Sequence, residues 1–162
     1  MASNWFASLV IIAVSGLSAA ALPPTFADFP VKTIFKGKPA APNLSTPNAR
    51  RFRTQLRLQA PLGPDFAGHF KLARWGCGAG CVSVAVIDSI TGDVYFAPFT
   101  FQDGHRALED GHEPTCHHAS DFNLDSELFI VEGDIADKVG THYYRWHDNK
   151  FTPVYYEPVC SI

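Results

Sequence analysis

The stretch from Gly68 to Asp88 constrains the fold of this chain more than any other, because it is typical of two strands joined by a very short turn. In the first arm, Gly68–Trp75, alternate residues share a face, which places His69 and Trp75 on the same side. The second arm, Val82–Asp88, is almost entirely apolar and rich in valine, as is typical of a central strand covered on both faces. The sequence therefore predicts a β-hairpin at the centre of a sheet.

The turn between the two arms has the sequence GCGAGC, from Gly76 to Cys81. Its glycines permit the positive φ angles that a short hairpin loop needs. If Gly78–Gly80 form the loop, Cys77 and Cys81 flank it at paired positions, whose Cα atoms lie about 4.5–5.5 Å apart, within disulfide range. Closing so small a ring constrains the unfolded chain by only about 2 kcal/mol. We therefore expect the disulfide to keep the loop rigid more than to stabilise the whole fold.

Three motifs of the chain, FAGHF, RWGCGAGC and the ID-x-x-TG-x-VYF that ends the apolar arm, occur in this order. On these motifs the chain resembles a family of small secreted bacterial proteins, which typically carry GH-aromatic followed by WGCG-x-x-C. The resemblance covers Phe52 to Tyr156. It implies an exported domain of this fold class and no particular biochemical activity.

The N-terminal segment, residues 1–27, contains no charged side chain. Its apolar core, Trp5–Leu17, followed by small residues is typical of a secretory signal peptide. We expect cleavage after Ala27, with Ala20 or Ala21 as the alternative. Because no Lys or Arg precedes the apolar core, an uncleaved membrane anchor is a further alternative. A periplasmic or extracellular location follows from this segment.

The chain has four cysteines, and an even number in an exported chain indicates disulfides and no free thiol. Of the three connectivities that four cysteines allow, we expect Cys77–Cys81 and Cys116–Cys160. The second bond would tie a long acidic loop to the C-terminus. Redox activity is not expected of Cys77 and Cys81, because their C-x₃-C spacing precedes a strand instead of the helix that follows a reactive C-x-x-C.

One helix is predicted after an extended segment of residues 28–45, in which Val31–Phe35 is a candidate edge strand. Thr46 is a suitable N-cap, and Pro47 occupies the first helical position, where its missing N–H costs nothing. Pro61 ends the pattern. The apolar residues at helical spacing are Ala49, Phe52, Leu56 and Ala60.

Residues 46–162 are predicted to form a single α+β domain, an antiparallel β-meander of five to six strands with the one N-terminal helix packed across the sheet. Pro153 in the last strand indicates a sheet edge. Phe101–Phe122 is predicted to be a long loop. The strands expected after the central hairpin are Val94–Phe99, Leu128–Glu132, Gly140–His147 and Phe151–Tyr156.

Charge is unevenly distributed along the chain. Nine Lys or Arg and two acids lie between Asp28 and Trp75, whereas four Lys or Arg and fourteen acids follow from Gly76. Attraction between the two halves of one domain explains this split, and a basic face for an anionic partner is the alternative. The arginines of the predicted helix, Arg50, Arg51, Arg53 and Arg57, are expected to be solvated or paired with the acidic half. A nucleic-acid partner does not suit an exported, acidic chain.

No residues in the chain form a standard catalytic or metal-binding motif. The best metal candidates do not have a standard ligand spacing, so no metal or other cofactor is expected and none is needed for folding; they are His105, His112, Cys116, His117 and His118. The serines at positions 83, 120 and 126 lack the context of a nucleophile elbow.

These observations predict a binding or inhibitory module centred on the hairpin loop, with another exported protein or a host protein as partner. The candidate site residues are His69, Trp75, Gly78, Ala79 and Gly80. The arrangement is similar to that of the vertebrate-type lysozyme inhibitors of bacterial periplasm, whose cysteine-bounded loop also carries a histidine and an acid that are missing here. The alternative is a periplasmic enzyme in which His69 acts with Asp65 or Asp88.

Overall fold

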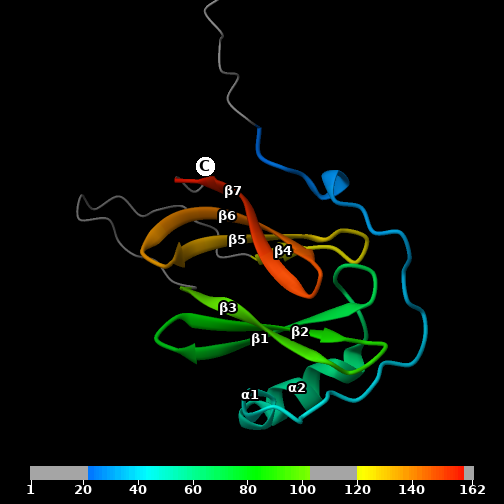
Figure 1. Cartoon of the computed structure of the whole chain (residues 1–162). Helices are drawn as coiled ribbons and strands as arrows, with labels where there is room; N and C mark the ends of the chain where they lie inside the picture. The colour runs from blue at the N-terminus through cyan, green and yellow to red at the C-terminus, as the bar shows by residue number, and fades with distance from the viewer. Residues whose placement is uncertain (1–21, 103–119, 159–162) are drawn as a thin grey trace, which may run out of the picture.

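The computed structural model describes residues 22–102 and 120–158. The chain is mostly antiparallel sheet with a few short helices, which confirms the α+β class (Figure 1). The helices are η1 (Phe26–Asp28), α1 (Pro47–Arg51), α2 (Arg53–Gln59) and η2 (Ala60–Leu62). The strands are β1 (Phe70–Gly78), β2 (Cys81–Asp88), β3 (Val94–Gln102), β4 (Ser120–Phe122), β5 (Leu128–Ile135), β6 (Lys138–His147) and β7 (Lys150–Glu157).

The sheet has the strand order β1-β2-β3-β5-β6-β7, and β4 pairs with β5 beside this path. β3 and β5 meet at a single register pair, Gln102 with Asp134, so the sheet folds into two layers, β1–β3 and β4–β7 (Figure 1). β7 is an edge strand, as Pro153 predicts. The predicted number of strands was wrong, because β4 lies at the end of the expected loop. Its three residues are too few to show a period, and pairing with Phe129–Val131 defines it.

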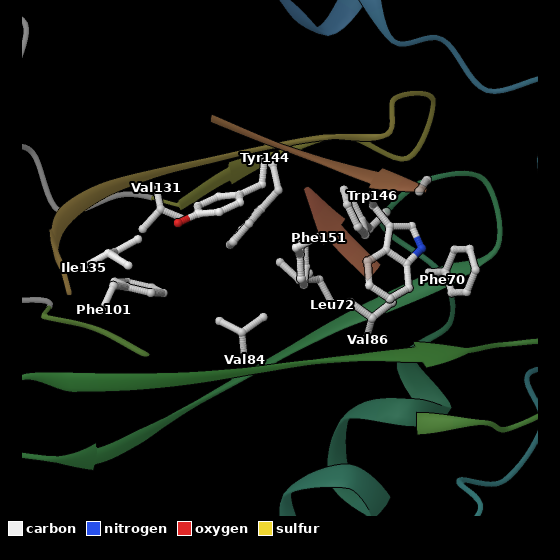
Figure 2. Packing of buried hydrophobic residues seen from close by; sticks show 13 residues of the cluster. Phe70, Leu72, Val84, Val86, Phe101, Val131, Ile135, Tyr144, Trp146 and Phe151 are labelled. Atoms are coloured by element: carbon white, nitrogen blue, oxygen red, sulfur yellow. The ribbon is translucent and has the colours of Figure 1, made fainter. Parts of the chain in front are cut away.

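The main hydrophobic core lies between the two layers, and its side chains point toward one another from both (Figure 2). The lower layer, β1–β3, and the segment before it contribute Phe66, Phe70, Leu72, Val84, Val86 and Phe101. The upper layer, β4–β7, contributes Phe129, Val131, Ile135, Tyr144, Trp146 and Phe151. The sheet thus buries its large apolar side chains against itself, which a two-layer fold requires.

The helices cover the outer face of β1–β3, where a second core holds Leu56 and Ala60 against Trp75 and Ile87. β2 is therefore buried on both faces, as its apolar run predicts. The Thr46 hydroxyl caps the first helix by accepting from the Ala49 N–H at 3.1 Å, as expected.

The prediction of one continuous helix was wrong, because the helical segment breaks at Phe52. This residue has φ −101° and ψ 19°, outside the α-helical range, and separates α1 from α2. Its ring packs on Trp75 and Phe96, with centroid distances of 5.0 and 5.8 Å. The break therefore lies where the segment contributes its aromatic ring to the second core.

Side chains protect part of the free edge of β1. The Gln59 amide donates to the carbonyl oxygen of Arg74 at 2.9 Å and accepts from its N–H at 3.0 Å, as a neighbouring strand would. An Asp65 carboxylate oxygen accepts from the Leu72 N–H at 2.9 Å. Polar partners on an edge strand satisfy groups that could otherwise pair with another chain.

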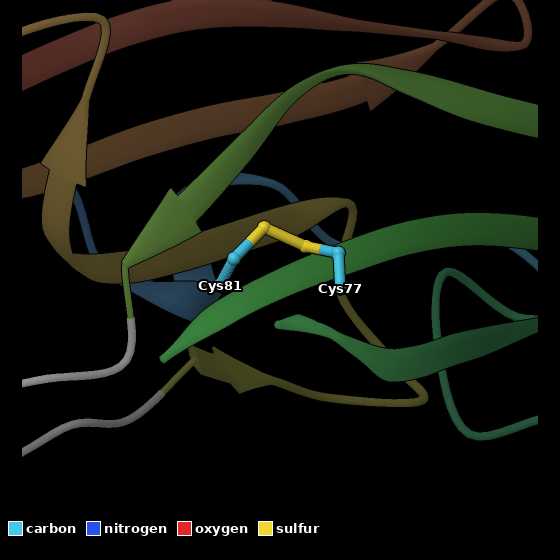
Figure 3. The surroundings of a disulfide bond; sticks show 2 residues. All are labelled: Cys77 and Cys81. Atoms are coloured by element: carbon cyan, nitrogen blue, oxygen red, sulfur yellow. A yellow bond between two sulfur atoms is a disulfide. The ribbon is translucent and has the colours of Figure 1, made fainter. Parts of the chain in front are cut away.

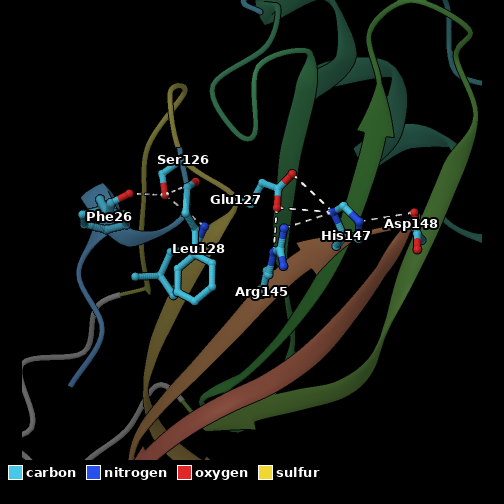
Figure 4. Close-up of polar contacts among 8 residues, drawn as sticks. Phe26, Ser126, Glu127, Leu128, Arg145, His147 and Asp148 are labelled. Atoms are coloured by element: carbon cyan, nitrogen blue, oxygen red, sulfur yellow. Dashed lines mark hydrogen bonds and ion pairs between the residues drawn. The ribbon is translucent and has the colours of Figure 1, made fainter. Parts of the chain in front are cut away.

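The segment before the helices runs along the domain without forming the strand predicted at Val31–Phe35. Val31 donates its N–H to the Asp125 carbonyl, and Phe35 donates to Gly68, so the bonds go to two different loops and make no ladder. The segment is fixed at its start by Ser126, whose hydroxyl contacts the carbonyl oxygens of Phe26 at 2.9 Å and Phe29 at 3.1 Å (Figure 4).

A buried histidine lies on β6. His142 is 7% exposed, and its Nε2 lies 2.9 Å from the carbonyl oxygen of Lys138. Burial lowers the pKa of His142, while hydrogen bonds to the backbone of Lys138 and Gly133 and the charge of Asp134 oppose this effect. The neutral imidazole is thus favoured in the folded chain.

This lowered pKa makes stability depend on pH. Below pH about 6.5 the unfolded chain protonates this residue more readily than the folded chain. We therefore expect the His142 contribution to the free energy of unfolding to decrease as the pH is lowered through this value, by at most about 1.4 kcal/mol per pH unit. Urea unfolding can be measured between about pH 5 and 8, where histidine titrates. The free energy of unfolding should change less steeply with pH in His142→Gln than in the unchanged protein. Identical slopes would contradict the prediction.

Candidate functional site

The central hairpin ends in a loop of two residues, Ala79 and Gly80, with φ of +44° and +77°. Positive φ at both positions is the pattern of a type I′ turn, whose twist matches that of the strands. The prediction of a three-residue loop was therefore wrong, because Gly78 pairs with Cys81. The register shifts between Gly76 and Gly78, which leaves Cys77 as the extra residue of a bulge.

The predicted Cys77–Cys81 disulfide is present, with a Cα–Cα distance of 5.0 Å (Figure 3). Cys116 and Cys160 lie outside the described residues, as do His105, His112, His117 and His118. The bond links the bulge of β1 to the first residue of β2, and thereby closes the hairpin tip, which we define as residues Gly76–Cys81.

The hairpin tip projects into solvent. Residues 76–80 are all exposed, and a Cβ atom added to Gly78 would meet no other atom within 4 Å. A second hairpin turn, Ala136–Asp137, repeats the backbone conformation with φ of +53° and +62°. Both turns lie at the same end of the two layers (Figure 1). The molecule thus carries two alanine turns of one geometry, of which only the hairpin tip is closed by a disulfide.

Trp75 is not an exposed neighbour of the hairpin tip. It is 8% exposed and packs beneath the helices, against Phe52 and Phe96. His69 precedes β1, at the opposite end of the hairpin from the tip. The alternation of the strand places both residues on one face, but the second core covers the tryptophan. The structure therefore does not bring His69, Trp75 and residues 78–80 into one site.

His69 lines a separate cleft of about 720 Å³, which we call the His69 cleft. Its Nε2 lies 4.0 Å from Oδ2 of Asp88, and its ring lies against Phe70 with a centroid distance of 3.9 Å. The other oxygen of Asp88 accepts from the N–H groups of Ile90 at 2.7 Å and Thr91 at 3.2 Å. One carboxylate thus fixes a turn, as turn aspartates do, and faces the histidine.

Asp65 does not belong to the His69 cleft. Its carboxylate pairs with Lys71 at 2.5 Å and with the Leu72 N–H, and it lines a smaller groove of about 380 Å³ beside Arg74 and Trp75. Of the two carboxylates considered as partners of His69, the structure brings only Asp88 close.

The His69 cleft is also lined by a polar cluster from β6, the turn after it and the residue before β5. Figure 4 shows the contacts within this cluster. Glu127 accepts from Arg145 Nε at 2.7 Å and lies 3.4 Å from His147 Nδ1. His147 Nε2 lies 3.6 Å from Asp148. Sequence reasoning missed this cluster, because its members face His69 only after the two layers close. The only local indication was that Arg145 and His147, two positions apart in one strand, must lie on the same face of the sheet.

Neither a metal-binding group of side chains nor a helix that could cross a membrane is found in the described residues. Across 22–102 and 120–158, no three His, Cys, Asp or Glu side chains are grouped so that they could hold a metal ion. Over the same ranges, no helix has the length and apolar character needed to cross a bilayer.

The fold and its two candidate regions define the class of the protein, a small two-layer α+β domain with a disulfide-closed hairpin tip and a polar cleft at the opposite end. Comparison with known protein-family models, curated proteins and solved structures gives no match. Function is therefore inferred from the geometry of the hairpin tip and the His69 cleft.

Proposed function

We propose that this chain is an exported binding or inhibitory module whose contact surface is the hairpin tip. The observation that carries the proposal is a turn closed by a disulfide while residues 76–80 remain exposed. Loops held rigid on a stiff scaffold commonly carry recognition, because little conformational entropy is lost when they bind.

The position of the disulfide supports recognition over simple stabilisation. The type I′ turn and the β1–β2 ladder already define the hairpin, and a ring of so few residues restricts the unfolded chain only modestly. The residue at the extreme of the loop, Ala79, has a methyl side chain between two glycines. Such a narrow tip fits a cleft of a partner protein, and its backbone N–H groups can donate there. An exported or host protein is the partner class that suits this surface.

The test is a charged side chain at the tip, with a matched control elsewhere. We expect Ala79→Glu to abolish capture of the partner from periplasmic extract or host secretions, because the bulky carboxylate blocks entry into a cleft. Ala136→Glu places the same side chain on an alanine of positive φ in a turn without a disulfide, so it should leave capture unchanged.

Circular dichroism and thermal unfolding should show that both variants keep the fold, since both positions are exposed. Full capture by a folded Ala79→Glu variant would reject the hairpin tip as the contact surface. Equal loss in both variants would mean that the effect is not specific to this turn.

Export itself is part of the proposal, and the start of the domain refines it. Thr25 donates its N–H to Asp28 at 2.7 Å, and the Phe26 carbonyl oxygen accepts from the buried Ser126 hydroxyl. Cleavage after Ala27 would remove two of these partners. The contacts therefore support cleavage after Ala20 or Ala21, which would leave Thr25 and Phe26 in the exported protein.

The alternative function is a periplasmic enzyme in which His69 acts with Asp88, and the cleft between the layers is the observation that favours it. Asp88 can orient the imidazole as a base, while His147 and Arg145 face the same space. A hydrolytic activity of the exported protein that is lost in both His69→Gln and Asp88→Asn, and retained in Ala79→Glu, would select this function over binding at the hairpin tip.

A further inference from the structure

The outer surface of α1 and α2 carries four exposed arginines. Three of them contact neutral groups: Arg50 contacts the carbonyl oxygens of Leu44 and Ser45, Arg53 the carbonyl oxygen of Arg50, and Arg51 the ring of Phe52 at 5.5 Å. Within residues 22–102 and 120–158 no carboxylate forms an ion pair with any of them. In this part of the chain the arginines are thus solvated, one of the two states that the sequence predicts, and pairing with the acidic half is not seen.

Two exposed leucines belong to the same helical segment, Leu58 in α2 and Leu62 in η2. Leu58 is 65% exposed and Leu62 is 73% exposed, whereas Leu56 and Ala60 are buried in the second core. Exposed apolar side chains rimmed by charged residues are a pattern of protein and membrane contact surfaces, and here the rim is basic. We call the surface formed by Arg50, Arg51, Arg53, Arg57, Leu58 and Leu62 the arginine–leucine face.

We propose that the arginine–leucine face binds the surface of an anionic phospholipid bilayer. Guanidinium groups bind phosphate bidentately, and leucines on the same helical surface can enter the boundary between head groups and acyl chains. A bilayer suits this face because it offers phosphate groups to the arginines and an apolar layer just below them to the leucines. The helices cover the outer side of β1–β3, where a flat lipid surface can reach them (Figure 1).

The distribution of acids in the fold favours the same orientation. Residues 120–158, which form β4–β7 and their turns, carry eight acids and three basic residues, whereas the helices cover the opposite layer (Figure 1). The acids are Asp121, Asp125, Glu127, Glu132, Asp134, Asp137, Asp148 and Glu157, and the basic residues are Lys138, Arg145 and Lys150. A negatively charged surface therefore attracts the helical side and repels the upper layer. The hairpin tip extends sideways from the helices and stays accessible to a partner in this orientation.

The test compares vesicles of phosphatidylcholine alone with vesicles that also contain phosphatidylglycerol. The full chain is used in the form that the cell exports, with its N-terminus established by mass spectrometry. We expect the partition constant to be at least about 25-fold higher on the anionic vesicles and to fall with salt. Amide hydrogen exchange should slow in residues 47–62 on the anionic vesicles only. Membrane binding through an apolar N-terminal segment would not slow exchange in these residues, so this measurement separates the two modes of binding.

Two pairs of substitutions separate the contributions of leucine and arginine. Leu58→Asn with Leu62→Asn should reduce anionic partitioning about tenfold or more. Arg51→Gln with Arg57→Gln should reduce it about 25-fold, at about fivefold for each basic residue. The control, Ile90→Asn with Val154→Asn, changes two other exposed apolar residues and should have no effect.

Three outcomes would overturn the proposal. The first is equal partitioning on neutral and anionic vesicles. The second is unchanged partitioning of the Leu58 and Leu62 double variant, with its fold verified by thermal unfolding. The third is binding to soluble acidic protein with no preference for phosphatidylglycerol, which would assign the arginine–leucine face to a protein partner.

Discussion

Replacing Phe66 by alanine is expected to lower the free energy of unfolding by about 3–5 kcal/mol. Phe66 is fully buried, and its ring lies 6.2–6.4 Å from the rings of four aromatic residues. They come from β4–β7 and are Phe122, Phe129, Trp146 and Phe151. Because Phe66 precedes β1, its ring joins the start of the lower layer to the upper one, and its loss would leave a cavity between the two.

Urea unfolding followed by tryptophan fluorescence measures this loss, since Trp146 lies beside Phe66. Phe66→Leu is the control, because it keeps a large apolar side chain and should lose clearly less stability than Phe66→Ala. Domains of this size are stable by about 5–15 kcal/mol, so Phe66→Ala should shift the midpoint strongly. Equal, small losses in both variants would show that the layers do not depend on this ring.

The second large effect concerns two leucines on one short helix. Leu56→Ala is expected to cost about 2–5 kcal/mol, because Leu56 is fully buried among Ala73, Ala85 and Ile87. Leu58→Ala makes the same chemical change two positions later, where the side chain is exposed, and should cost less than about 0.5 kcal/mol. The difference between the two variants isolates burial from helix propensity.

The arginines of the same segment extend this comparison. Arg50→Ala and Arg53→Ala should each cost less than about 1 kcal/mol, because both side chains are exposed. Differential scanning calorimetry on the four variants gives the order directly. Equal destabilisation by Leu56→Ala and Leu58→Ala would mean that the helix does not bury the face seen in the structure.

The local features of this fold could be predicted from the sequence, because their causes are local. The period of two in the central hairpin, the valines of Val82–Asp88 and the capping pair Thr46–Pro47 each act within a few residues. The Cys77–Cys81 disulfide belongs to the same group, since a tight turn brings the two residues together wherever the hairpin lies. Pro153 likewise identified an edge strand, because proline has no N–H to donate to a neighbouring strand.

Other features depend on how distant segments pack, and only the tertiary structure decided them. The break at Phe52 and the short strand β4 are defined by partners elsewhere in the chain, Trp75 and β5. Alternation places His69 and Trp75 on one face, but the helices cover only the tryptophan and the His69 cleft opens beside the histidine. The period of two along a strand determines on which face of the sheet a side chain lies, but it does not determine which other segment covers that face.

The His69 cleft illustrates this limit most clearly. His69, Glu127 and Arg145 line one cleft because β5 and β6 fold over β1–β3, which places residues more than fifty positions apart around the same space. Nothing local in the sequence links them. The sequence by itself determined the central hairpin, the disulfide of its turn and the class of fold, since these follow from backbone geometry and short-range contacts. The tertiary structure decided which residues share a site, because the closure of two layers, driven by burial of their apolar faces, sets those distances.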